Sequence, residues 1–168
     1  RSEQTGMWSY ADRTQEKYAP GYYSVPLVRY GVVAEMTATS RVGLHRYTFP
    51  AAEDAAIVFD LQNGGCWDGA EETYMKQESK TTISGWRLSR GWANNQKVYF
   101  VAEFSKPFES LEVLPESRYA RANFSTKEGE QLMLKVALSP VSVEGAKANM
   151  EAELKGWNFE ATAEKAKT

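Results

Sequence analysis

Residues 32–50 read VVAEMTATSRVGLHRYTFP and contain two runs in which apolar side chains recur at every second position. In the first run Val32, Ala34 and Met36 share one face of an extended chain, and in the second Val42 and Leu44 do the same. A period of two residues is the signature of a β-strand whose two faces have different surroundings. The stretch therefore predicts two successive strands, one before and one after the Ser-Arg pair at its centre.

Similar runs continue along the chain as far as residue 138. They predict further strands at residues 21–28, 55–61, 73–79, 81–88, 98–104, 109–114, 119–125 and 132–138. Turn-forming residues separate them at 50–54, 64–65, 91–97, 106–107 and 128–129. Parallel strands need helical crossovers, and these gaps are too short to hold them. The pattern therefore predicts an all-β fold, an antiparallel β-sandwich.

The apolar spacing changes after Pro140 from a strand period to a helical one. Ser142 is of a type that caps helix N-termini, and Asn158 can cap a second, shorter helix in the same way. The apolar positions of the first helix are Val143, Ala146, Met150 and Leu154. We therefore expect a sandwich domain at residues 1–139 and a short C-terminal helical tail at residues 140–168.

The two ends of the chain lead us to expect a piece of a longer protein. The second helix continues to Thr168 without a stop signal, and the chain starts at Arg1 without an initiator methionine. In such a piece, apolar groups of the tail and a free sheet edge would have lost their cover. We expect either a homodimer of the fragment formed through the tail or an open edge, or a tail that folds back across its own sheet. The alternative is a mobile, solvated tail.

Composition limits the classes of partner. The 168 residues are 42% hydrophobic and 25% charged, which is ordinary for one folded domain. The net charge of −2 provides no basic field for nucleic acid or anionic lipid, so neither is expected as a partner. No apolar run approaches the roughly 18–20 residues of a membrane span. The single cysteine, Cys66, excludes an intramolecular disulfide.

Few residues offer catalytic or metal-binding chemistry. His45 is the only histidine, so a His-rich metal site is excluded and a structural role on a sheet face is expected. Cys66 has acidic residues close by in the sequence, which favours an inert loop thiol over a reactive thiolate. The oxygen-bearing side chains around it could hold calcium, but the spacing is not that of an EF-hand, and a plain turn is favoured. These side chains are Asp60, Gln62, Asn63 and Asp68.

Carboxylates are present on several predicted strands. Glu35, Glu103 and Glu112 alternate with apolar residues, as expected for a sheet face in contact with solvent. A pair of carboxylates for glycoside hydrolysis could still come from distant strands. The solvated face is the favoured interpretation.

Aromatic residues in turns are the most suggestive feature of the sequence. Trp67 and Trp92 lie in glycine-containing segments with polar neighbours. An exposed indole offers a flat apolar surface on which a sugar can stack, and it serves equally well at a domain interface. The alternative is that each indole closes one end of the sandwich.

Several segments, taken in order, resemble one protein family. They are PGYYSV at 20–25, AEMTAT at 34–39, RVGLHRYTFP at 41–50, GWANNQKVYF at 91–100 and FSKPF at 104–108. This set resembles the N-terminal domain of glycoside hydrolase family 92, the calcium-dependent exo-acting α-mannosidases. Residues 149–163 are similar to the exit from that domain.

The resemblance implies a β-supersandwich that packs on a larger (α/α)6 barrel. It implies inverting hydrolysis of α-mannosides, often α-1,2-linked, with a glutamate as acid and an aspartate as base. Those carboxylates and most of the calcium shell belong to the helical domain of the family, so no catalytic residue and no metal ligand is assigned to this chain. Trp92, Asn95 and Gln96 match a family segment, and together with Trp67 they are the candidates for a sugar-facing or interdomain surface.

The sequence thus predicts the non-catalytic N-terminal domain of an α-1,2-mannosidase, supporting the catalytic domain and part of the substrate cleft. Calcium is expected in the parent enzyme and not on this chain. The expected partners are α-mannoside glycans, through the parent enzyme, and the helical catalytic domain. The family's role in glycan use predicts export to the periplasm or cell surface. Two alternatives stay open: a stand-alone carbohydrate-binding module using Trp67 and Trp92, and a purely structural or adhesive sandwich domain.

Overall fold

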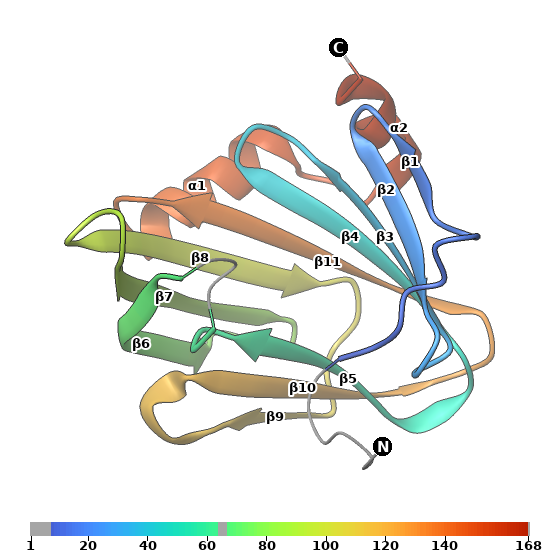
Figure 1. Cartoon of the computed structure of the whole chain (residues 1–168), viewed down its shortest axis with the longest axis horizontal. Coiled ribbons are helices and arrows are strands. Elements are labelled where there is room, and N and C mark those ends of the chain that lie inside the picture. Colours follow the sequence, from blue (N-terminus) through green and yellow to red (C-terminus); the bar gives the residue numbers. More distant parts are fainter. Residues whose placement is uncertain (1–7, 64–66, 168) are drawn as a thin grey trace.

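Eleven strands form two antiparallel sheets in a computed structural model that describes residues 8–63 and 67–167 (Figure 1). The large sheet has eight strands in the order β1-β2-β3-β4-β11-β8-β7-β6. Their bounds are β1 Lys17–Ala19, β2 Tyr22–Leu27, β3 Val32–Ala38, β4 Val42–Phe49, β11 Glu130–Ser139, β8 Gln96–Phe104, β7 Thr82–Arg90 and β6 Gly69–Gln77. The antiparallel sandwich predicted from the sequence is confirmed.

A smaller sheet covers part of the inner face of the large one. It contains β5 (Ala52–Asp60), β10 (Tyr119–Thr126) and β9 (Ser110–Val113), in that order. A short 3-10 turn, Pro115–Ser117, joins β9 to β10. The prediction of a turn over residues 50–54 was too long, because Ala52 already pairs with Thr126 across the ladder. The three-residue strand β1 was not predicted.

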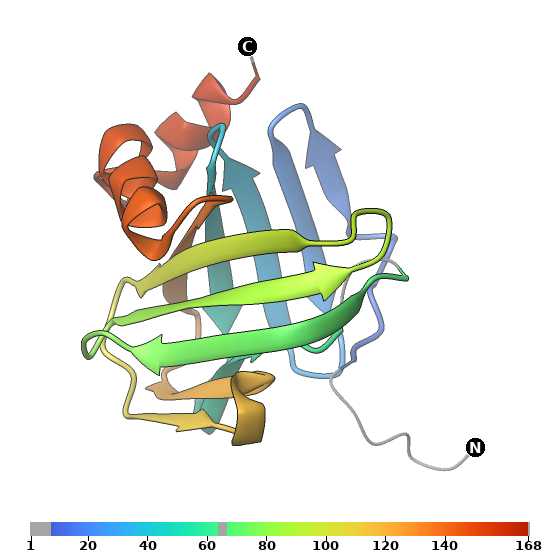
Figure 2. The ribbon, with the colours of Figure 1, turned by 90° about the vertical axis from the view of Figure 1, so that its left-hand side faces the viewer.

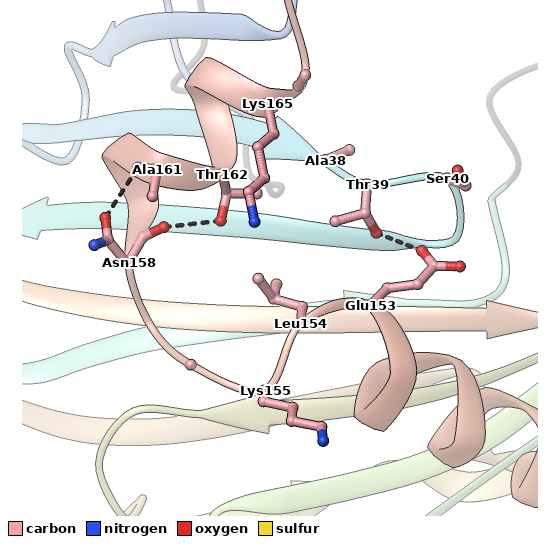
Figure 3. Close-up of a pocket in the computed structure, with 12 residues that line it drawn as sticks. Ala38, Thr39, Ser40, Glu153, Leu154, Lys155, Asn158, Ala161, Thr162 and Lys165 are labelled. Carbon is pink, nitrogen blue, oxygen red and sulfur yellow. Dashed lines mark hydrogen bonds between the residues drawn. The ribbon is translucent and has the colours of Figure 1, made fainter. Parts of the chain in front are cut away.

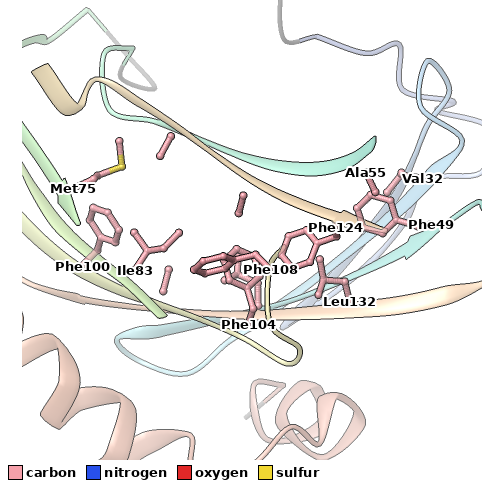
Figure 4. Packing of buried hydrophobic residues seen from close by; sticks show 14 residues of the cluster. Val32, Phe49, Ala55, Met75, Ile83, Phe100, Phe104, Phe108, Phe124 and Leu132 are labelled. Atoms are coloured by element: carbon pink, nitrogen blue, oxygen red, sulfur yellow. The ribbon is translucent and has the colours of Figure 1, made fainter. Parts of the chain in front are cut away.

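The core between the sheets follows from the alternation along the central strands (Figure 4). Phe100 and Phe104 of β8 point inward together with Leu132 of β11, and all three are buried. The Phe104 ring lies 5.1 Å from that of Phe124 on the small sheet, measured between centroids. Aromatic rings at such separations add stabilisation beyond the area they bury.

The helical tail covers the outer face of the large sheet (Figure 2). Helix α1 spans Val143–Glu153 and helix α2 spans Phe159–Lys165. Both predicted caps are present. The Ser142 side chain accepts a hydrogen bond from the Gly145 amide at 3.0 Å, and Asn158 accepts one from the Ala161 amide at 2.9 Å. The tail therefore folds back across its own sheet, one of the outcomes expected for it.

The tail helices bury a second apolar cluster on this outer face. The cluster contains Val42, Leu44, Val101, Ala137, Ala146, Met150, Leu154, Phe159 and Ala163. The central strands β4, β8 and β11 are consequently buried on both faces where the small sheet and the helices both cover them. Neither helix in the described part of the chain is long and apolar enough to cross a membrane.

The prediction of a solvated face around Glu35 was wrong, because α2 covers that face. The Glu35 carboxylate accepts hydrogen bonds from Arg46 at 2.8 and 2.9 Å and from the Tyr22 hydroxyl at 2.9 Å. The Arg46 guanidinium lies 4.2 Å from the ring centroid of Phe159 on α2. Hydrogen bonds from Arg46 hold the pKa of Glu35 below its usual value, despite an opposing effect of burial.

A lysine is buried on the same outer face, beneath the segment that links the two helices. The Lys135 side chain is 3% exposed, and its ammonium donates to the Lys155 carbonyl at 3.2 Å. It also lies 4.1 Å from the Trp157 ring centroid and 3.8 Å from a carboxylate oxygen of Glu103. Burial lowers the pKa of Lys135, and Glu103 opposes that effect. The charge is thus partly compensated by a carbonyl, a ring and a carboxylate.

Candidate functional surface

The two tryptophans singled out in the sequence lie on the surface. Trp92 is 94% exposed in the turn between β7 and β8, and Trp67 is 73% exposed just before β6. The alternative in which each indole closes an end of the sandwich is therefore wrong. Asn95 lies in the same turn as Trp92, and Gln96 begins β8, and both are exposed.

Gly91 shows that the two turns are in direct contact. A Cβ atom at Gly91 would lie 2.7 Å from the Cβ of Asp68 and 3.5 Å from Cζ3 of Trp67. Only glycine fits without displacing the Asp68 segment. Trp67 is thus beside the residue that precedes Trp92, and we call these five residues, Trp67, Gly91, Trp92, Asn95 and Gln96, the indole tip.

A partly buried ion pair anchors the Trp67 side of the indole tip. Arg87 of β7 donates from Nη1 to Asp68 Oδ2 at 2.5 Å and from Nε to the Leu61 carbonyl at 2.9 Å. The Arg87 and Asp68 side chains are 16% and 12% exposed. Charge-assisted hydrogen bonds between arginine and a carboxylate are strong and have a well-defined geometry. The Arg87–Asp68 pair therefore holds the backbone next to Trp67 in place.

Hydrogen bonds within the chain also occupy the side chains that were considered as calcium ligands. One Asp60 oxygen accepts from the Gln62 and Asn63 amides at 2.9 Å, and the other accepts from the Asn63 side chain at 2.9 Å. Asp68 is paired with Arg87. In the described ranges no group of three His, Cys, Asp or Glu side chains could hold a metal ion. Cys66 lies outside the described residues.

Part of the inner face of the large sheet is left uncovered by the small sheet. Leu138 of β11 and Val98 of β8 point to the same side as the inner core, yet they are 47% and 36% exposed. Cross-strand pairing places further residues on this side. We call the set Met36, Ala38, Gly43, His45, Val136, Leu138 and Val98 the open strip.

His45 belongs to the open strip and has a structural environment. Its Nδ1 lies 2.8 Å from the Tyr47 hydroxyl, and the two rings meet edge to face. Burial lowers the pKa of His45 and raises that of Tyr47 to about 12. His45 is thus held neutral as a hydrogen-bonding partner within the sheet.

A cleft of about 590 Å³ separates the two tail helices from the turn between β3 and β4 (Figure 3). Its polar groups bind one another. Thr39 donates to Glu153 at 2.6 Å, and Thr162 donates to the Asn158 carbonyl at 2.8 Å. The cleft is therefore a joint between the tail and the sheet.

Six carboxylates of the described chain are poorly suited to general acid catalysis. A catalytic acid needs a raised pKa so that it keeps a proton near neutral pH. In the described part of the chain, every carboxyl group with a resolved shift has its pKa lowered, chiefly by hydrogen bonds from a cation or hydroxyl. These are Asp12, Glu35, Glu78, Glu130, Glu153 and Glu160.

Comparison with known proteins identifies one family. The profile of the glycosyl hydrolase family 92 N-terminal domain matches residues 1–139. A comparison with curated protein sequences gives no match.

Solved structures of the same fold are much longer than this chain. The family GH92 α-mannosidase BT3965 of Bacteroides thetaiotaomicron is 32% identical, with a TM-score of 0.90, over 95% of this chain and 24% of that one. A second structure of that enzyme contains mannoimidazole. The family GH92 inverting mannosidase BT2199 from the same organism is 26% identical, with a TM-score of 0.77, over 93% of this chain and 22% of that one. The chain thus spans about a quarter of the length of these enzymes.

Proposed function

The chain belongs to the glycosyl hydrolase family 92 N-terminal domain family, and we propose that it is the non-catalytic N-terminal domain of an α-mannoside hydrolase. The observation that supports this most strongly is the 32% identity to an α-mannosidase of which the chain corresponds to 24%. The domain would support a catalytic domain and contribute to one wall of its substrate cleft. The reaction we propose for the whole protein is inverting hydrolysis of α-1,2-mannosides, in line with the inverting relative.

The acid and the base of that reaction would come from the rest of the protein. Inversion needs two carboxyl groups about 6.5–9.5 Å apart, one of them with a raised pKa. The carboxyl groups with resolved shifts here are held ionised, as described above. Calcium would likewise be bound outside this chain, since Asp60 and Asp68 already accept hydrogen bonds from neighbouring groups.

The open strip and the indole tip are the surfaces we assign to contact with the catalytic domain. An exposed apolar patch that spans several strands is unusual in a free-standing domain and is typical of an interface. Leu138 and Val98 are exposed large apolar side chains of the open strip, and Trp92 is the most exposed apolar side chain of the indole tip. Interdomain contacts of this kind fix the position of a supporting domain beside a cleft.

The test is to measure mannose release from 4-nitrophenyl α-mannoside by this chain and by the longer protein, with and without calcium. The chain alone should be inactive, and the longer protein should be active. Leu138→Asp in the longer protein should weaken activity and domain association, because it places a charge on the open strip. Tyr74→Ala, at an exposed aromatic on the other face of the sheet, is the matched control. Activity of the chain alone, lost on mutation of one of its carboxylates, would refute the proposal.

A second candidate function is carbohydrate binding by the isolated chain. It is favoured by one feature, two exposed indoles in adjoining turns, with the exposed residues Asn95 and Gln96 following Trp92 along the chain. Flat apolar rings beside polar groups suit the mixed surface of a pyranose. Titration of the chain with yeast mannan, followed by tryptophan fluorescence, should then show saturation that Trp92→Ala weakens about tenfold. Tyr74→Ala should have no effect. A flat titration would exclude this candidate and leave the first one standing.

A further inference from the structure

The sheet edges of the described chain differ in how well they are protected. Natural proteins blunt exposed edges by keeping them short or by placing charges on them. The edge strands β1 and β9 have three and four residues. The edge strand β6 carries Glu71, Glu72 and Lys76. The fourth edge, β5, has nine residues, of which 55–59 (AAIVF) are uncharged.

The backbone groups on the outer side of β5 can be assigned from its register with β10. The Leu61 amide donates to the Arg118 carbonyl at 2.8 Å, which fixes the alternation of the ladder. Residues 55, 57 and 59 then pair with β10 by hydrogen bonds. The N–H and C=O groups of Ala56, Val58 and Asp60 point away from the sheet, and no described strand pairs with them.

A cavity of about 580 Å³ lies beside this edge. One wall is β5 itself, from Asp54 to Val58, and Leu27, Val32 and Tyr47 of β2, β3 and β4 contribute to the remaining lining. Trp8 and Ser9, which precede β1, also line the cavity. Because β9 contacts β6 at the far side of the small sheet, β5 is the edge nearest these strands. The cavity therefore occupies the position in which the next strand of the small sheet would place its inward side chains.

We propose that the free edge of β5 is a docking site for an extended segment of the longer protein. The segment would add a fourth strand to the small sheet by main-chain hydrogen bonds, with alternate apolar side chains in the cavity. Glu53, Asp54 and Asp60 are exposed at the two ends of the edge, so a segment with basic residues at its ends is the best electrostatic match.

A second copy of the chain fits this edge poorly. Antiparallel pairing of β5 with its copy would produce a two-fold axis normal to the small sheet. Both large sheets would then lie on the same side, and the strands β1 to β3 of the two copies would compete for the same space. The acidic ends of the two edges would also approach each other. A single added strand from the longer protein would cause neither the steric clash nor the charge repulsion.

The test is residue-resolved amide hydrogen exchange in this chain and in the longer protein. The Ala56 and Val58 amides should exchange freely in the chain alone and at least about tenfold more slowly in the longer protein. The Ile57 and Phe59 amides, which already pair with β10, are internal controls. This inference rests on the proposed function, because it assumes that the chain is part of a longer protein. Hydrogen exchange tests it without any measurement of activity. Equal, fast exchange of Ala56 and Val58 in both proteins would overturn it.

A pair of proline variants gives an independent readout. Val58→Pro removes only an outward amide, so it should leave the thermal stability of the chain alone nearly unchanged and lower that of the longer protein. Gln77→Pro is the matched control, because the bond from the Glu78 amide to the Thr82 carbonyl places the Gln77 amide on the free side of β6. It should have the same small effect in both proteins. An equal cost of Val58→Pro in both proteins, or a dimer of the chain alone that Val58→Pro dissociates, would contradict the proposal.

Discussion

The two faces of the large sheet are buried in different ways. The inner face is covered by another sheet, and its core cluster contains five phenylalanine rings linked by ring contacts, with one partly buried ion pair, Arg87–Asp68, where β7 meets the end of β5. The outer face is covered by two short helices, and charged groups lie between helix and sheet. Lys135 is 3% exposed there, and Arg46 and Glu35 are 15% and 14% exposed.

This difference shows that the two covers are attached by different forces. A sheet packed on a sheet buries a broad apolar area, and the hydrophobic effect that stabilises this contact is non-directional. Helices of eleven and seven residues bury much less, and their caps and charges fix where they lie. A buried ion pair adds little net stability but specifies position, since breaking it leaves an uncompensated charge. We therefore expect the inner core to dominate stability per residue and the outer anchors to position the tail.

Removing the tail should have the largest effect. Truncation after Ser139 deletes α1 and α2 and exposes the outer cluster around Leu44. The lost burial of Met150, Leu154 and Phe159 alone amounts to roughly 5–9 kcal/mol. We expect a protein that is largely unfolded or self-associated at micromolar concentration, as measured by urea unfolding and sedimentation. An unchanged unfolding midpoint would show that the tail contributes no stability.

A pair of phenylalanine substitutions compares the two clusters directly. Phe104→Ala should cost about 3–5 kcal/mol, because the rigid inner core cannot close the cavity. Phe159→Ala should cost less, near the lower end of the same range of about 3–5 kcal/mol, because the seven-residue α2 can shift toward the sheet. Both residues are at most 2% exposed, so the comparison is matched for burial. Urea unfolding gives both values, and a larger cost for Phe159→Ala would reverse the ranking.

Replacing the buried lysine should be neutral or favourable. Lys135→Met removes a charge that burial disfavours, and we expect a change between zero and about 2 kcal/mol of added stability at pH 7. Since burial lowers its folded pKa below 10.5, the cost of the charge is present at neutral pH and disappears as the pH rises toward 10.5. The advantage of the variant should therefore shrink in alkaline buffer. Lys147→Met, at a lysine 44% exposed on α1, is the control and should change stability little.

The smallest expected effect concerns His45. Burial lowers its folded pKa below 6.5, so the unfolded chain takes up a proton first as the pH falls. The contribution of neutral His45 is then fully present above pH 6.5 and is lost between there and the lowered pKa. His45→Gln should flatten this part of the stability curve. An equal slope of stability against pH in wild type and variant between pH 6.5 and 5 would show that other groups cause the pH dependence.

Local sequence signals identified most of the elements. The alternation in residues 32–49 marks β3 and β4, and Ser142 and Asn158 mark the helix starts, because strand periodicity and capping depend on neighbours along the chain. The exposure of the indole tip could not be deduced in this way. Glycine-rich turns around Trp67 and Trp92 are compatible with both a plug and a surface.

The sequence by itself determined that this is an antiparallel β protein with a helical tail and apolar strands at its centre. Only the tertiary structure decided which face of each strand is covered by the small sheet and which by the helices. Glu35 has the sequence pattern of a solvated residue, yet α2 covers it, because Arg46 and Phe159 complete its surroundings from positions 11 and 124 residues away. The free edge of β5 is likewise a property of strand order. Hydrophobic periodicity and strand propensity are properties of one segment of the chain. Strand pairing and the covering of a sheet face depend instead on which segments come together.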